Sequence, residues 1–256
     1  MERKTETAEG CYLYCIMGSG EARSCDTAGI GGRGDVVSII NYEDLSCATS
    51  PSPLGEYAVT RENLMAHQKV VEEAMKDHTV LPVRFSTIAK SPDDIRGVLR
   101  KRYAEFKSLY EKMEGKVELG LKALWKDMGR VFKDIAEEDM LVKRLKDRTA
   151  GALPGKGFDA GVELGRAVKA ALERKKEETA GKIISAFRDI SVDFRTNKTH
   201  GDNMALNAAF LVNESDMVEF DRRVKELDSR GGGDISLRYV GPVPPFNFVN
   251  IVIEWN

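Results

Sequence analysis

Four cysteines near the start of the chain are the residues best suited to bind a metal ion. They are Cys11, Cys15, Cys25 and Cys47. Zinc sites usually take two thiolates from one tight turn, whereas Cys11 and Cys15 lie four residues apart on an expected strand, too far apart to share one ion. We therefore predict no metal site, and interpret the cysteines as unpaired thiols or small core residues.

Two histidines, together with a cysteine, are the candidates for nucleophilic catalysis. His67 and His78 lie on one expected helix, where a spacing of eleven residues separates them by about 16 Å along the axis. They cannot both act on one reacting centre. Both belong to the apolar stripe of that helix, so we interpret them as packing residues whose ring nitrogens are hydrogen-bonded.

Two glycine-rich stretches resemble phosphate-binding loops only superficially. Residues 151–157 read Gly-Ala-Leu-Pro-Gly-Lys-Gly, which lacks the P-loop spacing and has glycine where a serine or threonine would hold magnesium. Gly18-Ser19-Gly20 follows an expected strand, but no third glycine opens a helix after it. We predict no nucleotide and no other cofactor. Because no catalytic set is found, the sequence indicates that the protein is not an enzyme.

Composition excludes several classes of partner. The 256 residues include 39 basic and 41 acidic side chains, a net charge of −2, so the chain lacks the positive field that favours nucleic acid or anionic lipid. No apolar run reaches the roughly 18 residues expected of a membrane-spanning helix. The N-terminus is polar and has no signal-peptide pattern. We expect a cytoplasmic protein that binds neither nucleic acid nor membrane.

The pattern of apolar residues predicts an α+β fold in two domains, after a disordered segment at residues 1–10. The N-terminal domain, 11–115, is expected to be a modified α+β sandwich. Its predicted elements are strand 11–17, a glycine-rich loop 18–34, strands 35–41 and 45–49, a break at 50–53, helix 60–78 behind the cap Thr60, strand 79–85, and a helix from Ser91 to Gly115.

The C-terminal domain, 116–256, is predicted to be ferredoxin-like. Strand 116–125 alternates cleanly. The elements expected after it are helix 127–148, a linker at 151–155, helix 158–189, strands 191–196 and 204–212, helix 216–228 and strand 234–240. This order is β-α-β-β-α-β with one inserted helix. A last strand, 247–255, is expected to be added at the end.

Two features stand out as candidates for binding. Arg84 lies in an otherwise apolar strand, where a partly buried charge would need a carboxylate or carbonyl partner. Residues 241–246 read Gly-Pro-Val-Pro-Pro-Phe, and their prolines hold Phe246 and Phe248 in a rigid, extended segment. A stiff connector is one interpretation of this segment, and an exposed docking element for another chain is the other.

Five segments, in order along the chain, resemble those of one known family. They are 12–16, His67 with 80–87, 116–122, 207–212 and 239–249. Together they resemble the GvpF/GvpL family of gas vesicle proteins. Ser86 stands where the family pattern has glycine, and the loop 18–34 matches no family segment.

The resemblance implies a non-catalytic accessory or minor structural protein of gas vesicles, in the cytoplasm and at the vesicle. Its implied partners are the small hydrophobic shell protein (GvpA-type) and other accessory proteins, and its implied role is in vesicle nucleation and assembly. The signature residues, which are also candidates for partner binding, are His67, Pro82, Arg84, Phe85, Gly241, Pro242, Pro244, Pro245, Phe246 and Phe248. The alternative is a small-ligand-binding regulator or an enzyme on ferredoxin-like domains, which would require a pocket with convergent polar groups.

Overall fold

The computed structural model describes residues 8–18, 25–150, 158–230 and 234–255. The chain forms two units: Met1–Glu118 together with Pro242–Asn256, and Leu119–Gly241. The boundary after Glu118 lies close to the one expected before residue 116. The segment from Pro242 onward, which was expected to belong to the second domain, groups with the first. Within the described ranges, no helix is both long enough and apolar enough to span a membrane.

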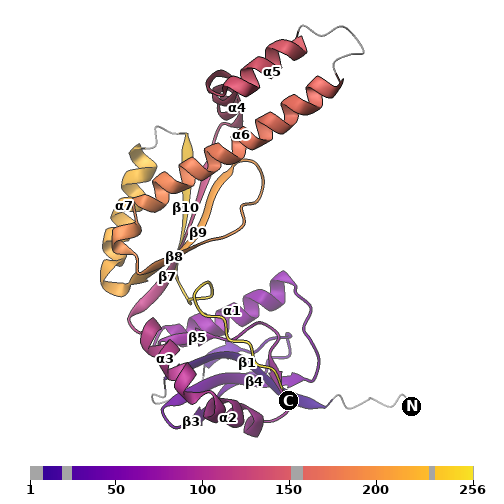
Figure 1. Ribbon diagram of the computed structural model, residues 1–256. Helices are drawn as coiled ribbons and strands as arrows, with labels where there is room; N and C mark the ends of the chain where they lie inside the picture. Colours follow the sequence, from indigo (N-terminus) through magenta and orange to yellow (C-terminus); the bar gives the residue numbers. More distant parts are fainter. Residues whose placement is uncertain (1–7, 19–24, 151–157, 231–233, 256) are drawn as a thin grey trace, which may run out of the picture. The chain divides into compact units, whose positions relative to one another are not determined.

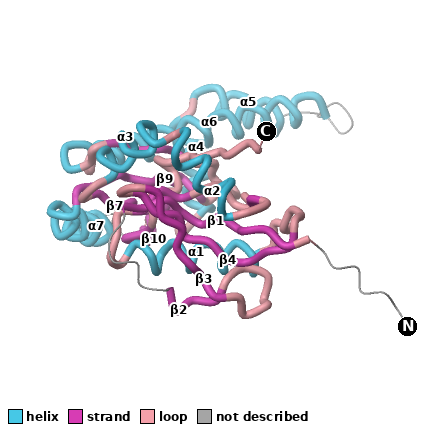
Figure 2. Tube along the Cα trace, turned by 90° about the horizontal axis from the view of Figure 1, so that it is seen from below, coloured by secondary structure: helices cyan, strands magenta, loops and turns pink. Residues whose placement is uncertain are grey.

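The first unit is built on a sheet with order β2-β3-β4-β1-β5, and β6 also pairs with β1. The strands are β1 (Glu9–Gly18), β2 (Cys25–Ala28), β3 (Val36–Tyr42), β4 (Leu45–Pro53), β5 (Val80–Pro82) and β6 (Ile88–Ala89). The helices are α1 (Arg61–Met75), α2 (Pro92–Lys101) and α3 (Tyr103–Met113). Figure 2 shows α1 on one face of the sheet and α2 and α3 on the other. The central strand β1 is therefore buried on both faces.

Several boundaries in the first unit differ from those expected. Glu9 and Gly10 belong to β1, although they were expected to be disordered; residues 1–7 lie outside the described part of the chain. The glycine-rich loop contains β2. The expected break at residues 50–53 is a continuation of β4, because from Ser50 onward this strand pairs with β1 alone. Its other side is then an edge, where prolines are tolerated.

Two predicted elements of the first unit are shorter than expected. The helix expected from Ser91 to Gly115 is divided at Arg102, which leaves the helical conformation and donates from its guanidinium to the carbonyl of Val252. The strand expected at 79–85 ends at Pro82. Val83 still donates its N–H to the carbonyl of Tyr14 on β1, and the chain leaves the sheet after it until it approaches β6, with Ser86 at a positive φ of 65°.

The strand predicted at 247–255 does not form. The residues after Pro244 make short-range turns, in which the N–H groups of Phe248 and Val249 both donate to the carbonyl of Pro245. A single parallel bridge joins Ile251 to Val83. Alternation of apolar residues thus predicted a strand where the first residues instead form a turn.

The second unit has the strand order β10-β7-β9-β8 (Figure 1). Numbered within the domain, this order is 4-1-3-2, as expected of a ferredoxin-like β-α-β-β-α-β chain. The strands are β7 (Lys116–Trp125), β8 (Asp193–Thr196), β9 (Met204–Asn213) and β10 (Ile235–Val243). The helices are α4 (Met128–Glu138), α5 (Met140–Ala150), α6 (Phe158–Ser185) and α7 (Met217–Arg230). The expected linker at 151–155 lies outside the described residues.

The helix predicted at 127–148 is two helices because Asp139 interrupts it. Asp139 is extended, and its carboxylate accepts the N–H groups of Leu141 and Val142 at 3.0 Å each. These bonds cap α5 and compete with continuation of α4. They also lower the pKa of Asp139, the bond from Val142 being the largest cause. Two helices, rather than one, are therefore inserted before α6.

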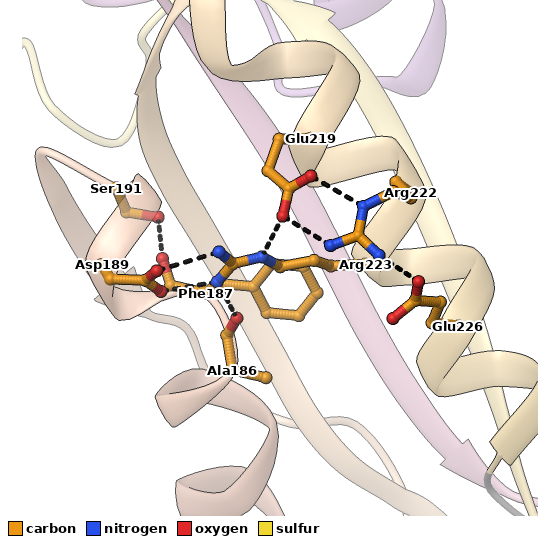
Figure 3. A network of polar contacts seen from close by, with 8 residues as sticks. All are labelled: Ala186, Phe187, Asp189, Ser191, Glu219, Arg222, Arg223 and Glu226. Carbon is orange, nitrogen blue, oxygen red and sulfur yellow. Dashed lines mark hydrogen bonds and ion pairs between the residues drawn. The ribbon is translucent and has the colours of Figure 1, made fainter.

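A network of polar contacts joins α7 to the end of α6 (Figure 3). Arg223 donates to the carbonyl of Ala186 at 2.8 Å, to Asp189 at 2.5 and 2.9 Å, and to Glu219 at 2.7 Å. It lies beside a cluster of buried rings in which Phe187 and Phe220 are stacked with centroids 4.4 Å apart. Arg223 thereby satisfies a carbonyl at the C-terminal end of the α6 segment, where helices leave acceptors unpaired.

We expect Arg223→Met to lower the free energy of unfolding by about 1–2 kcal/mol, because it leaves the Ala186 carbonyl and Asp189 without their donor. The matched control is Arg222→Met on the same helix. The Arg222 side chain is 54% exposed, against 23% for Arg223, and among the described residues its side-chain hydrogen bonds go to Glu219 and Glu226 of its own helix. Urea denaturation should show a clearly smaller loss for Arg222→Met; equal losses would contradict this role of Arg223.

Candidate binding groove

The first wall of the site is α1, which begins where the sequence predicts. Thr60 caps it by accepting the N–H of Asn63 at 3.2 Å. One turn further, His67 faces the sheet and is only 4% exposed. Its Nδ1 lies 3.0 Å from the hydroxyl of Tyr12 on β1. The interpretation of His67 as a hydrogen-bonded packing residue is thus confirmed.

The Tyr12 hydroxyl also fixes the second wall, the segment between β5 and β6. It accepts the N–H of Ser86 at 2.9 Å, and the Ser86 hydroxyl in turn accepts the N–H of Tyr57 at 2.8 Å. Ser86 is the residue at which the resemblance led us to expect a glycine. Its left-handed φ accounts for a glycine there, since a side chain in that region costs roughly 1–2 kcal/mol. The two hydrogen bonds hold the serine in place despite that cost.

Burial lowers the pKa of His67 to about 4, so the imidazole is neutral at physiological pH. Burial also raises the pKa of Tyr12, which keeps its hydroxyl protonated. No acceptor other than His67 Nδ1 lies within reach of that hydroxyl in the described residues. We therefore assign the Tyr12 proton to this bond, and the single N–H of the neutral imidazole to Nε2.

The third wall is a turn in the C-terminal segment. Pro244 and Pro245 are buried, and the N–H of Phe246 donates to the backbone carbonyl of Pro244 at 2.7 Å. Asn247 is held by Glu118, whose carboxylate accepts the backbone N–H at 2.8 Å and the side-chain amide at 2.6 Å. Burial raises the pKa of Glu118, and the two bonds from Asn247 oppose that rise. The turn leaves the Phe246 ring 37% exposed and 6.3 Å from the His67 ring.

The three walls enclose an open groove of about 330 Å³. Its lining is mainly apolar and comes from all three walls: Leu64, His67, Gln68, Pro82, Val83, Arg84, Phe85, Phe246, Val249, Asn250 and Ile251. Arg84 is the one residue of this lining with a formal charge. We expected its charge to be partly buried; instead the side chain is exposed, and within the described chain it forms no ion pair.

The groove brings together five of the residues singled out from the sequence: His67, Pro82, Arg84, Phe85 and Phe246. The others do not line it. Pro244 and Pro245 are buried, Phe248 is half-buried and Pro242 is exposed. Gly241, with φ of 146°, belongs to the second unit.

Six lining residues were not among the predicted site residues: Leu64, Gln68, Val83, Val249, Asn250 and Ile251. Leu64 could have been included, because it lies on the apolar stripe of α1 one turn before His67. Residues 249–251 were assigned to a strand, and nothing in their sequence indicates that they fold back beside Val83.

The cysteines form no metal site within the described residues, where no three His, Cys, Asp or Glu side chains are grouped as ligands. Cys11 and Cys47 are free cysteines. Burial raises the pKa of the Cys47 thiol, which disfavours the reactive thiolate.

Comparison with known proteins identifies the family. The model of the family described as gas vesicle synthesis protein GvpL/GvpF matches residues 10–250. The chain belongs to this family. Gas vesicle protein F1 of Halobacterium salinarum is 25% identical over 248 residues, which are 96% of this chain and 95% of that protein. Gas vesicle protein F of a Streptomyces species is 28% identical and covers 93% of this chain and 98% of its own length.

Solved GvpF structures share the fold. The crystal structure of the gas vesicle protein GvpF from Anabaena sp. PCC7120 has a TM-score of 0.80 at 22% identity and covers 96% of this chain and 100% of that one. GvpF from Microcystis aeruginosa has a TM-score of 0.76 at 22% identity, with coverages of 93% and 98%. The prediction of an α+β fold in the GvpF/GvpL family is confirmed.

The low pKa of His67 makes stability depend on pH. Between about pH 6.5, the ordinary histidine pKa, and about pH 4, the unfolded chain binds a proton that the folded chain does not, so stability falls as pH decreases. The loss attributable to His67 is about 2 kcal/mol between pH 7 and pH 5.

We expect His67→Gln to be less stable than the parent at pH 7 and to lose less further stability at pH 5. Urea denaturation at both pH values measures this difference, and contributions from other groups, Glu118 included, cancel between the two proteins. His78→Gln, at a histidine beyond the end of α1 and outside the groove lining, is the control. An unchanged pH dependence in His67→Gln would show that the pKa of His67 is not lowered in the folded protein.

Proposed function

We propose that this protein is a non-catalytic accessory protein of the gas vesicle that binds the small hydrophobic shell protein (GvpA-type) in the cytoplasm. In this role it assists vesicle nucleation and assembly together with other accessory proteins. Membership of the GvpL/GvpF family supports a role connected with gas vesicles. The observation that carries the finer proposal is the apolar groove of the first unit.

Subunits that wall off a gas space must expose apolar surface before they assemble. A binding partner lowers their tendency to aggregate if it covers part of that surface reversibly. The groove offers a surface of this kind, because most of its lining residues are apolar: Leu64, Pro82, Val83, Phe85, Phe246, Val249 and Ile251. A rigid turn holds the exposed Phe246 ring at the groove, so little side-chain entropy is lost when a partner covers this ring.

The alternative, an enzyme or a small-ligand regulator, receives less support from the same lining. The polar side chains that line the groove are His67, Gln68, Arg84 and Asn250. This set contains no carboxylate, hydroxyl or thiol to act as a nucleophile or as a second proton carrier beside His67. The low pKa of His67 also makes it a poor base at neutral pH. These properties favour binding over reaction.

The test is co-purification of the tagged protein from cells that also express the small shell protein. We expect the parent to capture the shell protein and Phe246→Ala to capture several-fold less, because the variant loses exposed aromatic surface at the groove. The matched control is Phe132→Ala on α4. The Phe132 side chain is 39% exposed, close to the 37% of Phe246, but it belongs to the second unit.

Capture by the parent and by Phe132→Ala, with loss in a folded Phe246→Ala protein, would support the proposal. Loss in Phe132→Ala alone would place the contact on the second unit and contradict the role of the groove. Absence of capture by the parent, with the other accessory proteins co-expressed, would contradict shell-protein binding itself.

A further inference from the structure

The backbone at Val83 and Arg84, in the second wall of the groove, is already hydrogen-bonded, which limits how a partner can bind. The N–H of Val83 donates to the backbone carbonyl of Tyr14 at 2.9 Å, and the N–H of Arg84 donates to the backbone carbonyl of Ile251 at 3.1 Å. The carbonyl of Arg84 accepts the Thr87 hydroxyl at 2.6 Å. An extended peptide that adds a strand needs a row of free N–H and C=O groups. The segment 83–84 does not offer one, so a partner must bind here through its side chains.

The dimensions of the groove suit a few side chains rather than a whole element. Its volume of about 330 Å³ lies at the lower end of the range for ligand pockets, roughly 300–1,000 Å³. Its floor is apolar, since Pro82, Val83 and Ile251 are buried. Leu64 and Phe246 rise at its sides and are partly exposed. An apolar residue, with a second one turn away on the same face of a helix, would fill this space.

Arg84 and the Nε2–H of His67 offer hydrogen-bond donors to the groove, while the side-chain amides of Gln68 and Asn250 carry both donors and acceptors. The Arg84 guanidinium is exposed and has no carboxylate partner in the described ranges. The imidazole of His67 is held at Nδ1 by Tyr12, which leaves its Nε2–H edge for the groove. The nearest acid bound to a lining residue is Glu72, which accepts the side-chain amide of Gln68 at 2.6 Å. The site therefore complements a partner group that accepts hydrogen bonds and carries negative charge.

From these three observations we propose that the groove binds an amphipathic helix of the partner. Its apolar side chains occupy the groove, and a glutamate or aspartate one turn away on the same face contacts Arg84. The apolar burial supplies most of the affinity, and the ion pair at the exposed rim selects the partner and fixes its direction. The inference rests on the proposed function for the identity of the partner, a shell subunit, but not for the chemistry of the groove.

The test uses a synthetic probe, so that it does not depend on the shell protein. The probe is a fluorescein-labelled helical peptide of about 16 residues, long enough to be partly helical when free. It carries two leucines four residues apart and a glutamate one turn beyond them, and a second peptide has glutamine in place of the glutamate. Fluorescence anisotropy measures both peptides against the full chain, against Arg84→Gln, and against the control Arg100→Gln, whose exposed arginine lies on α2 outside the groove.

We expect the glutamate peptide to bind the parent about three- to tenfold more tightly than the glutamine peptide, a difference in the range of exposed to partly desolvated ion pairs. Arg84→Gln should remove this preference by weakening only the glutamate peptide. Arg84→Lys should restore part of it, and Arg100→Gln should leave it unchanged. Phe246→Ala should weaken both peptides alike, because it removes apolar contact and no charge.

Equal affinity of the two peptides for the parent would overturn the role assigned to Arg84. Failure of both peptides to bind would overturn the helix proposal, and capture of the shell protein in the co-purification experiment would then show that the proposed function holds by another contact. Peptide binding without shell-protein capture would be the reverse result, in which the groove has the proposed chemistry but serves a different partner.

Discussion

The buried hydroxyl of Tyr12 joins three stretches of the first unit that are distant in sequence. The hydroxyl bonds to His67 on α1 and to the N–H of Ser86 in the segment after β5. The Tyr12 ring packs edge-on against Tyr57 and Phe85. A buried hydroxyl without partners would cost free energy, so this arrangement is favoured only when all three stretches are in place. The two walls that they form follow from this one constraint, and burial between them keeps His67 neutral.

The third wall depends on the burial of an acid and on the hydrogen bonds that offset its cost. Glu118 is a buried acid whose carboxylate is stabilised by two donors from Asn247. The prolines before Asn247 restrict the chain in advance, so that forming the turn loses less conformational entropy than it would in a flexible segment. The exposed Phe246 is thus held by neighbours that are themselves buried. This explains how an aromatic side chain can face solvent and still occupy one position beside His67.

The sequence predicted most strongly those features that depend on local chemistry. The alternation in β7, the Thr60 cap of α1, and the Ser91-Pro92 start of α2 are set by residues adjacent in the chain. Their positions were predicted to within a few residues. The ferredoxin-like order of the second unit followed from the order of elements alone. The helix breaks at Arg102 and Asp139 were missed, because there a side chain competes with the helical backbone in a way that apolar periodicity does not register.

Features that depend on distant partners were not predictable in the same way. Residues 247–255 alternate like a strand, but the turn after Pro244 and the bond to Glu118 decide their path. Arg84 was expected to be partly buried in a strand, yet the chain leaves the sheet after Val83 and places the side chain at the surface. The groove itself could not be predicted, since its walls come from residues 64–68, 82–85 and 246–251, and no local pattern relates them.

The division of the first unit into two stretches of sequence has a consequence for synthesis on the ribosome. Residues 246–251 emerge only after the whole of the second unit has been translated. Until then the emerging chain has α1 and β5 but lacks the wall formed by Phe246, Val249 and Ile251, and Val83 has no bridge partner. A nascent chain therefore cannot present the finished groove, and the surface becomes available only after both units have been made. The order of translation thus keeps the apolar groove incomplete until residues 246–251 have been synthesised.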